Sequence, residues 1–359
     1  MEAEIIRMVL NLFHGDDRTC GIGTSGGTES IMLAMLAYRE QGRARGVINP
    51  NIVCSETAHS AFVKAAFYFG LEVRKAKLTK DLLCDVAGMK KLIDSNTVCL
   101  VSSGPEYPFG NFDPLPEIAA LALKYNIGCH YDCCIGLINV FAEEAGFKLP
   151  YLSDFRVVGL TSISVDTHKY GFGPKGYSLC LFRSVELRDY QFFTHMDWNG
   201  GFYATPSMAG SRAGATIVGT WTALCVIGRK KYVEFAKKIF GAQKNIREAL
   251  KKECPEVDVG TRHTSPLVSI VTKPGKDQIN CIALGDVLLE HFNWSLNKAQ
   301  KPSGLKLTIT ETTAEHWQDL IRCIKASIKM MKENPALNHN SDVALYGMAG
   351  NMPDMTVLD

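Results

Sequence analysis

A histidine–lysine pair, His168-Lys169, stands between two segments that are typical of β-strands. The pair belongs to the stretch Ser-Ile-Ser-Val-Asp-Thr-His-Lys-Tyr-Gly-Phe-Gly-Pro-Lys-Gly over residues 162–176. The flanking segments, Phe155 to Val165 and Tyr177 to Phe182, are rich in β-branched, aromatic and other apolar residues, so we expect Lys169 in the turn between two strands. Burial or a neighbouring cation lowers the pKa of a lysine, and such an amine can form an imine. A solvated turn is the other interpretation of the pair.

A glycine-rich turn near the start of the chain is suited to an anion. Residues 24–30 read Thr-Ser-Gly-Gly-Thr-Glu-Ser and lead into Ile31 to Tyr38, an apolar stretch that indicates a buried helix. A turn that opens a helix directs free N–H groups and the positive end of the helix dipole at one point, which favours a phosphate. The hydroxyls of Ser25 and Thr28 would add donors. An ordinary capped helix fits the same pattern.

Two more side chains stand close to the ends of expected strands. His59 follows the segment Ile52 to Ser55, and Asp132 ends the segment Ile127 to Tyr131. An imidazole at such a position can stack on a flat ring, although a lone histidine is more often a helix-capping or core residue. An acidic residue at the end of a strand is most often a turn residue.

The order of expected elements predicts an α/β fold. From Asn51 the chain alternates strand-like and helix-like segments, and this rhythm favours a mostly parallel sheet with helices on both faces. Active sites in such sheets gather at the carboxyl ends of the strands. We expect a large domain over residues 1–225, a smaller α/β domain over 226–335 that begins with a long lysine-rich helix, and a tail over 336–359.

Bulk properties exclude several classes of function. The 359 residues are 46% hydrophobic, enough for a large core and two domains. A net charge of +2, from 39 basic and 37 acidic residues, gives no basic surface for nucleic acid or an anionic membrane. The 12 cysteines lack paired Cys-x-x-Cys spacing, so we expect neither a metal site nor a disulfide framework. No long apolar run is present, and we expect no membrane segment and a cytosolic chain as written.

Four motifs together resemble one enzyme family. They are Thr-Ser-Gly-Gly-Thr-Glu-Ser at 24–30, Thr-Ala-His-Ser-Ala-Phe at 57–62, His-Tyr-Asp-Cys-Cys-Ile-Gly at 130–136, and Ser-Ile-Ser-Val-Asp-Thr-His-Lys-Tyr-Gly at 162–171 with Pro-Lys-Gly following. The set is similar to that of the sphingosine-1-phosphate lyases, within the pyridoxal-phosphate-dependent group II decarboxylases. Because four separately spaced motifs coincide and the likeness covers roughly residues 1 to 350, a chance match is improbable.

The resemblance implies a fold, a cofactor and an assembly. The fold would be the type I pyridoxal-phosphate-dependent transferase fold, with a large mostly parallel sheet domain and a smaller C-terminal α/β domain. Pyridoxal 5'-phosphate would form a Schiff base with Lys169, His59 would stack on its ring, and Asp132 would keep the ring nitrogen protonated. The cofactor phosphate would lie near Ser25, Gly27, Thr28 and His168. In a homodimer, Ser211 in the loop Gly210 to Gly214 would reach the phosphate of the partner.

The substrate depends on other residues. Lys175 lies six residues after Lys169, where the resemblance implies a contact with a substrate phosphate, although a surface lysine in a turn fits as well. Tyr346 belongs to the tail motif Tyr-Gly-Met-Ala, which in the family can approach the active site. With these residues, the resemblance implies a lyase of sphingolipid metabolism that cleaves the C2–C3 bond of a phosphorylated long-chain base to a long-chain aldehyde and phosphoethanolamine.

Two other functions remain open. An amino-acid decarboxylase on the same fold would break the bond to a carboxyl group instead. A non-catalytic truncated relative would serve as a dimer partner. The motive for the latter is that full-length relatives carry an upstream membrane anchor and an arm with an Asn-Pro-Leu-His motif, and neither is found in this chain. With the anchor, the resemblance implies the cytosolic face of the endoplasmic reticulum membrane.

Overall fold

The computed structural model describes residues 1–275 and 278–339, and they divide into two compact units. The first unit comprises Met1–Tyr107 with Asn111–Ala236, and the second comprises Pro108–Gly110 with the residues from Lys237 on. The division falls within the helix α7 (Gly214–Glu253), as does the sequence-based boundary after residue 225. Inside α7 the backbone is non-helical at Gly228, where φ is 65°.

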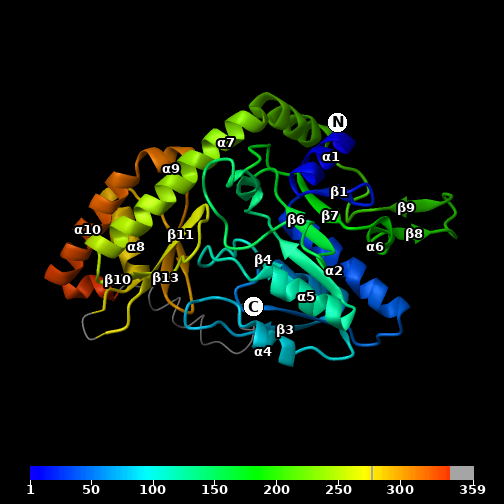
Figure 1. The fold of residues 1–359 in the computed structure, drawn as a ribbon, viewed down its shortest axis with the longest axis horizontal. Coiled ribbons are helices and arrows are strands. Elements are labelled where there is room, and N and C mark those ends of the chain that lie inside the picture. Colours follow the sequence, from blue (N-terminus) through cyan, green and yellow to red (C-terminus); the bar gives the residue numbers. More distant parts are fainter. Residues whose placement is uncertain (276–277, 340–359) are drawn as a thin grey trace. The chain divides into compact units, whose positions relative to one another are not determined.

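The first unit is built on a seven-stranded sheet, with strand order β1-β7-β6-β5-β4-β2-β3. Strands β6, β5, β4, β2 and β3 pair in parallel, whereas β7 runs antiparallel to both β6 and β1. Helices such as α2 and α5 lie along this sheet (Figure 1). The strands are β1 (Cys20–Thr24), β2 (Asn51–Ser55), β3 (Glu72–Ala76), β4 (Thr97–Ser103), β5 (Gly128–Asp132), β6 (Ser162–Val165) and β7 (Ser178–Phe182). A mostly parallel α/β sheet is confirmed.

The remaining elements of the first unit are helices and one short hairpin. Strands β2, β4 and β5 are buried along their whole length, as expected of a parallel sheet that is covered on both faces. The helices are α1 (Glu2–Leu12), α2 (Gly27–Ala44), α3 (Ala61–Phe69), α4 (Val86–Lys91), α5 (Leu115–Tyr125), the 3₁₀ helix η1 (Leu137–Phe141) and α6 (Val185–Asp189), and the hairpin joins β8 (Phe193–His195) to β9 (Tyr203–Thr205).

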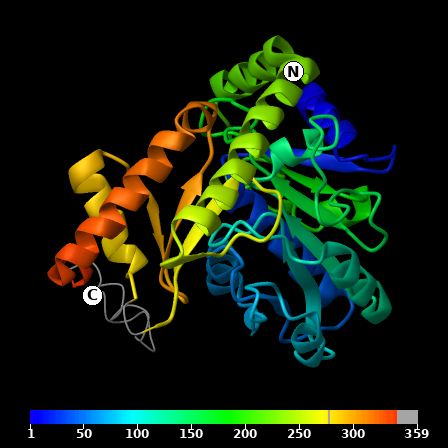
Figure 2. The same ribbon diagram turned by 60° about the vertical axis from the view of Figure 1, so that its left-hand side comes forward.

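The second unit has a four-stranded antiparallel sheet with strand order β10-β11-β13-β12. Helix α8 packs against three of its strands, and α10 lies beside α8 (Figure 2). The elements are β10 (Val257–Val259), β11 (Leu267–Thr272), α8 (Cys281–Phe292), β12 (Asn297–Ala299), β13 (Gly304–Thr308), α9 (Glu311–Glu315), α10 (Trp317–Glu333) and the 3₁₀ helix η2 (Pro335–Asn338).

The predicted strand-like segment Phe155 to Val165 is strand only in its second half, as β6. The first half turns at Gly159, whose φ of 94° is unfavourable for other residues, and a Cβ there would lie 2.4 Å from the carbonyl oxygen of Ala119. The side chain of Arg183 donates to the carbonyl oxygens of Phe155 and Val157 at 2.7 and 3.0 Å. These bonds replace the ladder bonds of a strand, so the prediction was wrong for that half.

Neither a membrane-spanning helix nor a disulfide is found among the described residues. Within the described residues, no helix is at once long enough and apolar enough to cross a membrane. All twelve cysteines are free thiols, and Cys225 on α7 is the exposed one among them.

Candidate active site

Four of the predicted stretches meet at one edge of the first unit's sheet. Because β7 is antiparallel to both β6 and β1, strand β1 runs in the same direction as β2, β5 and β6. Their carboxyl ends therefore lie at the same edge, and each is followed by one of the motifs. Active sites of α/β sheets are built at such edges.

The glycine-rich turn after β1 packs directly against the loop that carries Lys169. A Cβ built on Gly27 would lie 2.7 Å from both Asp166 Oδ1 and Cys134 Sγ, so only glycine fits there without movement. A Cβ on Gly26 would lie 4.0 Å from Cε1 of His168. The first and last motifs of the sequence are thus in contact.

Lys169 lies in the turn after β6, as predicted, and its amine is held by a carboxylate. The Nζ atom is 2.8 Å from Oδ2 of Asp166, which is 2% exposed, while the lysine side chain is 39% exposed. Burial is the largest single influence and lowers the pKa of Lys169. The charge and hydrogen bond of Asp166, together with the acidic groups of Cys134 and Asp132, outweigh burial, so the pKa is raised above its usual value. The sequence-based expectation of a lowered pKa therefore does not hold for the free amine.

Sequence reasoning missed Asp166, although it lies three residues before Lys169 within the quoted motif. Its second oxygen, Oδ1, accepts a hydrogen bond of 2.5 Å from the Ser178 hydroxyl. His168 lies beside this pair: its Nε2 is 3.8 Å from Asp166 Oδ2, and its Nδ1 is 3.0 Å from the carbonyl oxygen of Tyr177. Since a carbonyl only accepts, Nδ1 of His168 carries the proton in this bond.

Asp132 ends β5 and is 8% exposed. Its Oδ1 accepts from the backbone N–H of Cys134 at 3.1 Å and from the Ser164 hydroxyl at 3.2 Å. Its Oδ2 has no hydrogen bond to any described residue, so this oxygen is open to a ligand. His59 lies after β2 with an exposed side chain, and its Nδ1 accepts from the backbone N–H of Ala61 at 3.1 Å.

The phosphate donors assigned to the glycine-rich turn are partly taken. Both the backbone N–H and the hydroxyl of Ser25 donate to Oε2 of Glu29 at 2.6 Å, and Glu29 is buried. Thr28 is exposed at the first turn of α2. Glu29 is a second residue that sequence reasoning missed, although it lies inside the first motif.

Within the described residues, Lys169 forms no hydrogen bond or ion pair with either Ser211 or Lys175. Ser211 is exposed, and its neighbour Arg212 forms an ion pair with Glu2 of α1. Lys175 is exposed and forms no ion pair within the part of the chain that the structure describes. Tyr346 lies outside the described residues.

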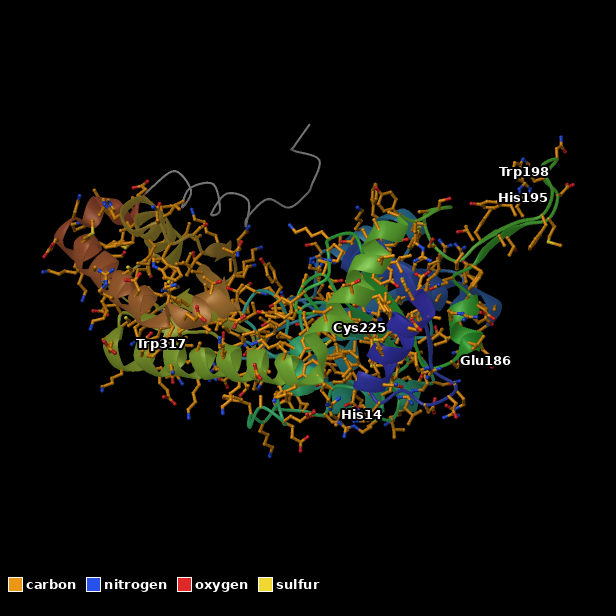
Figure 3. All side chains as sticks on the ribbon, turned by 90° about the horizontal axis from the view of Figure 1, so that it is seen from above. His14, Glu186, His195, Trp198, Cys225 and Trp317 are labelled. Carbon is orange, nitrogen blue, oxygen red and sulfur yellow. The ribbon has the colours of Figure 1, made fainter. Side chains whose placement is uncertain are left out.

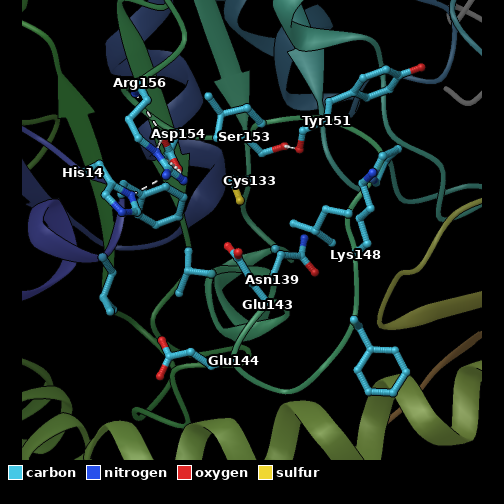
Figure 4. Close-up of a pocket in the computed structure, with 18 of the residues that line it drawn as sticks. His14, Cys133, Asn139, Glu143, Glu144, Lys148, Tyr151, Ser153, Asp154 and Arg156 are labelled. Carbon is cyan, nitrogen blue, oxygen red and sulfur yellow. Dashed lines mark hydrogen bonds and ion pairs between the residues drawn. The ribbon is translucent and has the colours of Figure 1, made fainter.

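A pocket of about 710 Å³ lies apart from these residues (Figure 4). It is lined by Tyr131, which precedes Asp132 in β5 and therefore points to the opposite face of the sheet. Asp154 pairs there with His14 and Arg156, and the buried side-chain amide of Asn139 has no hydrogen-bond partner among the described residues. No sequence-predicted site residue lines this pocket.

The residues at the carboxyl edge fit pyridoxal 5'-phosphate. A partly exposed lysine amine, a buried carboxylate with one open oxygen and an exposed imidazole suit its aldehyde, ring nitrogen and ring face. The close approach at Gly27 and the exposed Thr28 suit its phosphate.

Comparison with known proteins identifies the family of this chain. The model of the pyridoxal-dependent decarboxylase conserved domain matches residues 1–272. Sphingosine-1-phosphate lyase 1 of Rattus norvegicus is 40% identical over 352 residues, which cover 97% of this chain and 61% of the relative. Sphingosine-1-phosphate lyase of Saccharomyces cerevisiae is 36% identical, with 100% of this chain and 61% of the relative covered. The chain thus spans about three fifths of the length of these relatives.

Solved structures agree with the sequence comparisons. The sphingosine-1-phosphate lyase of Burkholderia pseudomallei has a TM-score of 0.87 and 32% identity, over 99% of this chain and 81% of that chain. Glutamate decarboxylase of Lactobacillus brevis shares the fold, with a TM-score of 0.79 at 21% identity. The chain belongs to the pyridoxal-dependent decarboxylase family.

Proposed function

We propose that this chain is a pyridoxal-phosphate-dependent lyase of sphingolipid metabolism. It would cleave the C2–C3 bond of a phosphorylated long-chain base, such as sphingosine 1-phosphate, to a long-chain aldehyde and phosphoethanolamine. The proposal rests on one observation. The motifs that contain Lys169, Asp132 and His59 lie at the same edge of the sheet. The substrate class rests on the sphingosine-1-phosphate lyases to which the chain is similar.

The residues of the site have separate tasks in this proposal. The bound cofactor supplies an electron sink for the pair released when the C2–C3 bond breaks. Lys169 offers the amine that attaches it, Asp132 holds a proton at the ring nitrogen through Oδ2, and His59 covers the ring. Ser25, Gly27, Thr28 and His168 hold the phosphate, together with Ser211 of the partner subunit.

Lys175 is the residue that we assign to the substrate phosphate. Its side chain is exposed and unpaired within the described residues, so its charge is available to a ligand. A charge-assisted bond to a phosphate stabilises a complex by about 1.5 to 3 kcal/mol. We assign Tyr346 to the same substrate from the family tail motif alone.

The functional unit in this proposal is a homodimer. The hairpin of β8 and β9 stands out from the rest of the first unit, with His195 and Trp198 at its end (Figure 3). It exposes large apolar side chains: Phe193, Met196, Trp198 and Phe202. Exposed apolar patches of this kind mark interaction sites. For a form with a membrane anchor, we place the enzyme at the cytosolic face of the endoplasmic reticulum.

The test is product formation by the purified protein. After incubation with pyridoxal phosphate and a phosphorylated long-chain base, we expect long-chain aldehyde, and none from Lys169→Ala. Borohydride reduction and peptide mapping should place the pyridoxyl group on Lys169. Carbon dioxide from an amino acid without aldehyde would favour the decarboxylase, and bound cofactor without any turnover would favour the non-catalytic dimer partner.

A further inference from the structure

A chain of buried hydrogen bonds runs through the sheet to Asp132. The hydroxyl of Tyr38, on α2, is 2.5 Å from Ser162 Oγ, and Ser162 Oγ is 2.7 Å from Nδ1 of His130. On the other side of the imidazole, Nε2 is 3.1 Å from Ser164 Oγ, which donates to Asp132 Oδ1 at 3.2 Å. All five residues are buried.

The register of two parallel strands creates this chain. In the pairing of β5 with β6, His130 stands opposite Ser162 and Asp132 stands opposite Ser164. Residues two apart on a strand point to the same face, so both pairs share one side of the sheet. There the ring of His130 also meets the edge of Phe62, with ring centroids 5.8 Å apart.

The direction of each bond between Asp132 and Ser162 follows from the carboxylate. An ionised Asp132 only accepts, so the Ser164 hydroxyl gives it a proton and must itself accept from Nε2–H of His130. Nδ1 of the neutral imidazole is then an acceptor, and it takes the proton of Ser162. Ser162 can then accept from Tyr38, whose hydroxyl also lies 2.7 Å from Thr161 Oγ1 and 3.3 Å from the carbonyl oxygen of Cys129.

These hydrogen-bond directions require the imidazole of His130 to be neutral. Burial lowers the pKa of His130 to about 4, even though the charge of Asp132 acts in the opposite sense. A protonated ring would donate from both nitrogens and would reverse the bond to Ser162. Buried hydrogen bonds of this kind strengthen one another in a low dielectric, and a buried polar group that loses its partner destabilises the fold.

We propose that His130, as the neutral Nε2–H tautomer, is a positioning residue for Asp132 through Ser164, with the Ser162 hydroxyl donating to its Nδ1. The relay holds Oδ1 of Asp132 and leaves Oδ2 free for the ring nitrogen. The inference deepens the proposed function, since it rests on Asp132 as the partner of the cofactor ring. Neither His130 nor Tyr38 touches the reacting atoms.

The first test uses the full chain without cofactor. Histidines are labelled with ¹⁵N, and the resonances of His130 are identified by their loss in His130→Gln. We expect the pattern of an Nε2–H tautomer in the parent. Ser164→Ala should shift the signals of His130 towards an average of the two tautomers, whereas Ser164→Thr, which keeps the hydroxyl, should retain the parent pattern.

A matched control removes a buried serine hydroxyl elsewhere. Ser269→Ala, in β11 of the second unit, deletes bonds to Thr261 and to the carbonyl of Phe109 and should leave the His130 signals unchanged. An Nδ1–H tautomer in the parent, or no response to Ser164→Ala, would overturn the proposal. Thermal melting of each variant shows whether it is folded.

The second test measures cofactor affinity. Ser164→Ala should raise the dissociation constant of pyridoxal phosphate roughly five- to ten-fold, the effect of about one lost hydrogen bond, and Ser164→Thr should restore it. An unchanged constant in Ser164→Ala would contradict the positioning role. If the parent binds no cofactor, the proposed function fails while the tautomer result still stands.

Discussion

The carboxylate of Glu29 lies 2.6 Å from both the backbone nitrogen and the hydroxyl oxygen of Ser25. An acidic side chain thus occupies the donors that we assign to the phosphate of the cofactor. Its other oxygen accepts from the backbone N–H of Met208 at 3.0 Å. A phosphate that binds at this turn has to displace or tolerate a negative charge.

We therefore expect Glu29→Gln to bind pyridoxal phosphate more tightly than the parent. Removing a like charge near a phosphate should lower the dissociation constant several-fold, since such pairs repel by about 1 kcal/mol or more at 4 Å. Absorbance titration of the apoprotein measures the constant, with pyridoxal as a control that lacks the phosphate. Weaker binding of pyridoxal phosphate by Glu29→Gln would show that the carboxylate supports the turn instead.

Asp166→Asn should lower the pKa of Lys169 in the apoprotein. An opposite charge within about 4 to 6 Å shifts a pKa by roughly 1 to 3 units, and Asp166 raises the pKa of Lys169 through both its charge and its hydrogen bond. Competitive labelling of amines across a pH series, with peptide mapping, reports this pKa. Asp154→Asn, a buried carboxylate on the other face of the sheet, is the control, and the same Lys169 pKa in Asp166→Asn and the parent would refute the pairing.

Asp113 and His130 should affect stability with opposite slopes between about pH 4 and 6.5. Burial raises the pKa of Asp113 to about 7, so the folded state binds more protons than the unfolded state and stability falls as pH rises. Burial lowers the pKa of His130 to about 4, so the unfolded state binds more protons and stability rises with pH. Each slope is at most about 1.4 kcal/mol per pH unit.

Denaturant unfolding at a series of pH values separates the two effects. Relative to the parent, the unfolding free energy of Asp113→Asn should rise more steeply with pH, and that of His130→Gln should rise less steeply or fall. Parallel curves for the parent and either variant would show that the replaced group does not titrate differently on folding.

Some of this site follows from sequence alone. Strand-like segments end just before His59, at Asp132 and before Lys169. The carboxyl ends of parallel strands lie at one edge of the sheet regardless of the conformation of the loops. The contacts of Glu29 and Asp166 were not predictable, because each depends on how a side chain folds back on its own loop. The link from His130 to Ser164 depends on the register of β5 and β6, which the residue pattern of either strand leaves open.

Trp198→Ser should weaken the proposed homodimer. Trp198 is 53% exposed on the hairpin, and a buried tryptophan at an interface commonly accounts for 2 kcal/mol or more, so we expect the dissociation constant to rise roughly ten-fold or more. Sedimentation velocity across a concentration series measures it. Ile48→Ser, an exposed apolar residue beyond α2, is the control, and equal constants for both variants would remove the hairpin from the interface.

Lys175→Ala should raise the Michaelis constant for a phosphorylated long-chain base roughly ten-fold to a hundred-fold, because a charge-assisted bond to the substrate phosphate is lost. Binding of pyridoxal phosphate should barely change, and Lys91→Ala, an exposed lysine on α4, should alter neither quantity. Loss of cofactor with unchanged substrate kinetics would move Lys175 into the cofactor site.

The thiols of this chain differ in reactivity because they differ in burial. Ten of the twelve cysteines are buried and Cys20 is partly buried, and burial raises the pKa of thiols such as Cys54 and Cys129 to about 12. Since the thiolate is the reactive form, a maleimide at neutral pH should modify the exposed Cys225 first. The unmutated protein thus offers one attachment point on α7 for a fluorophore, through which subunit exchange can be followed by energy transfer between donor- and acceptor-labelled chains.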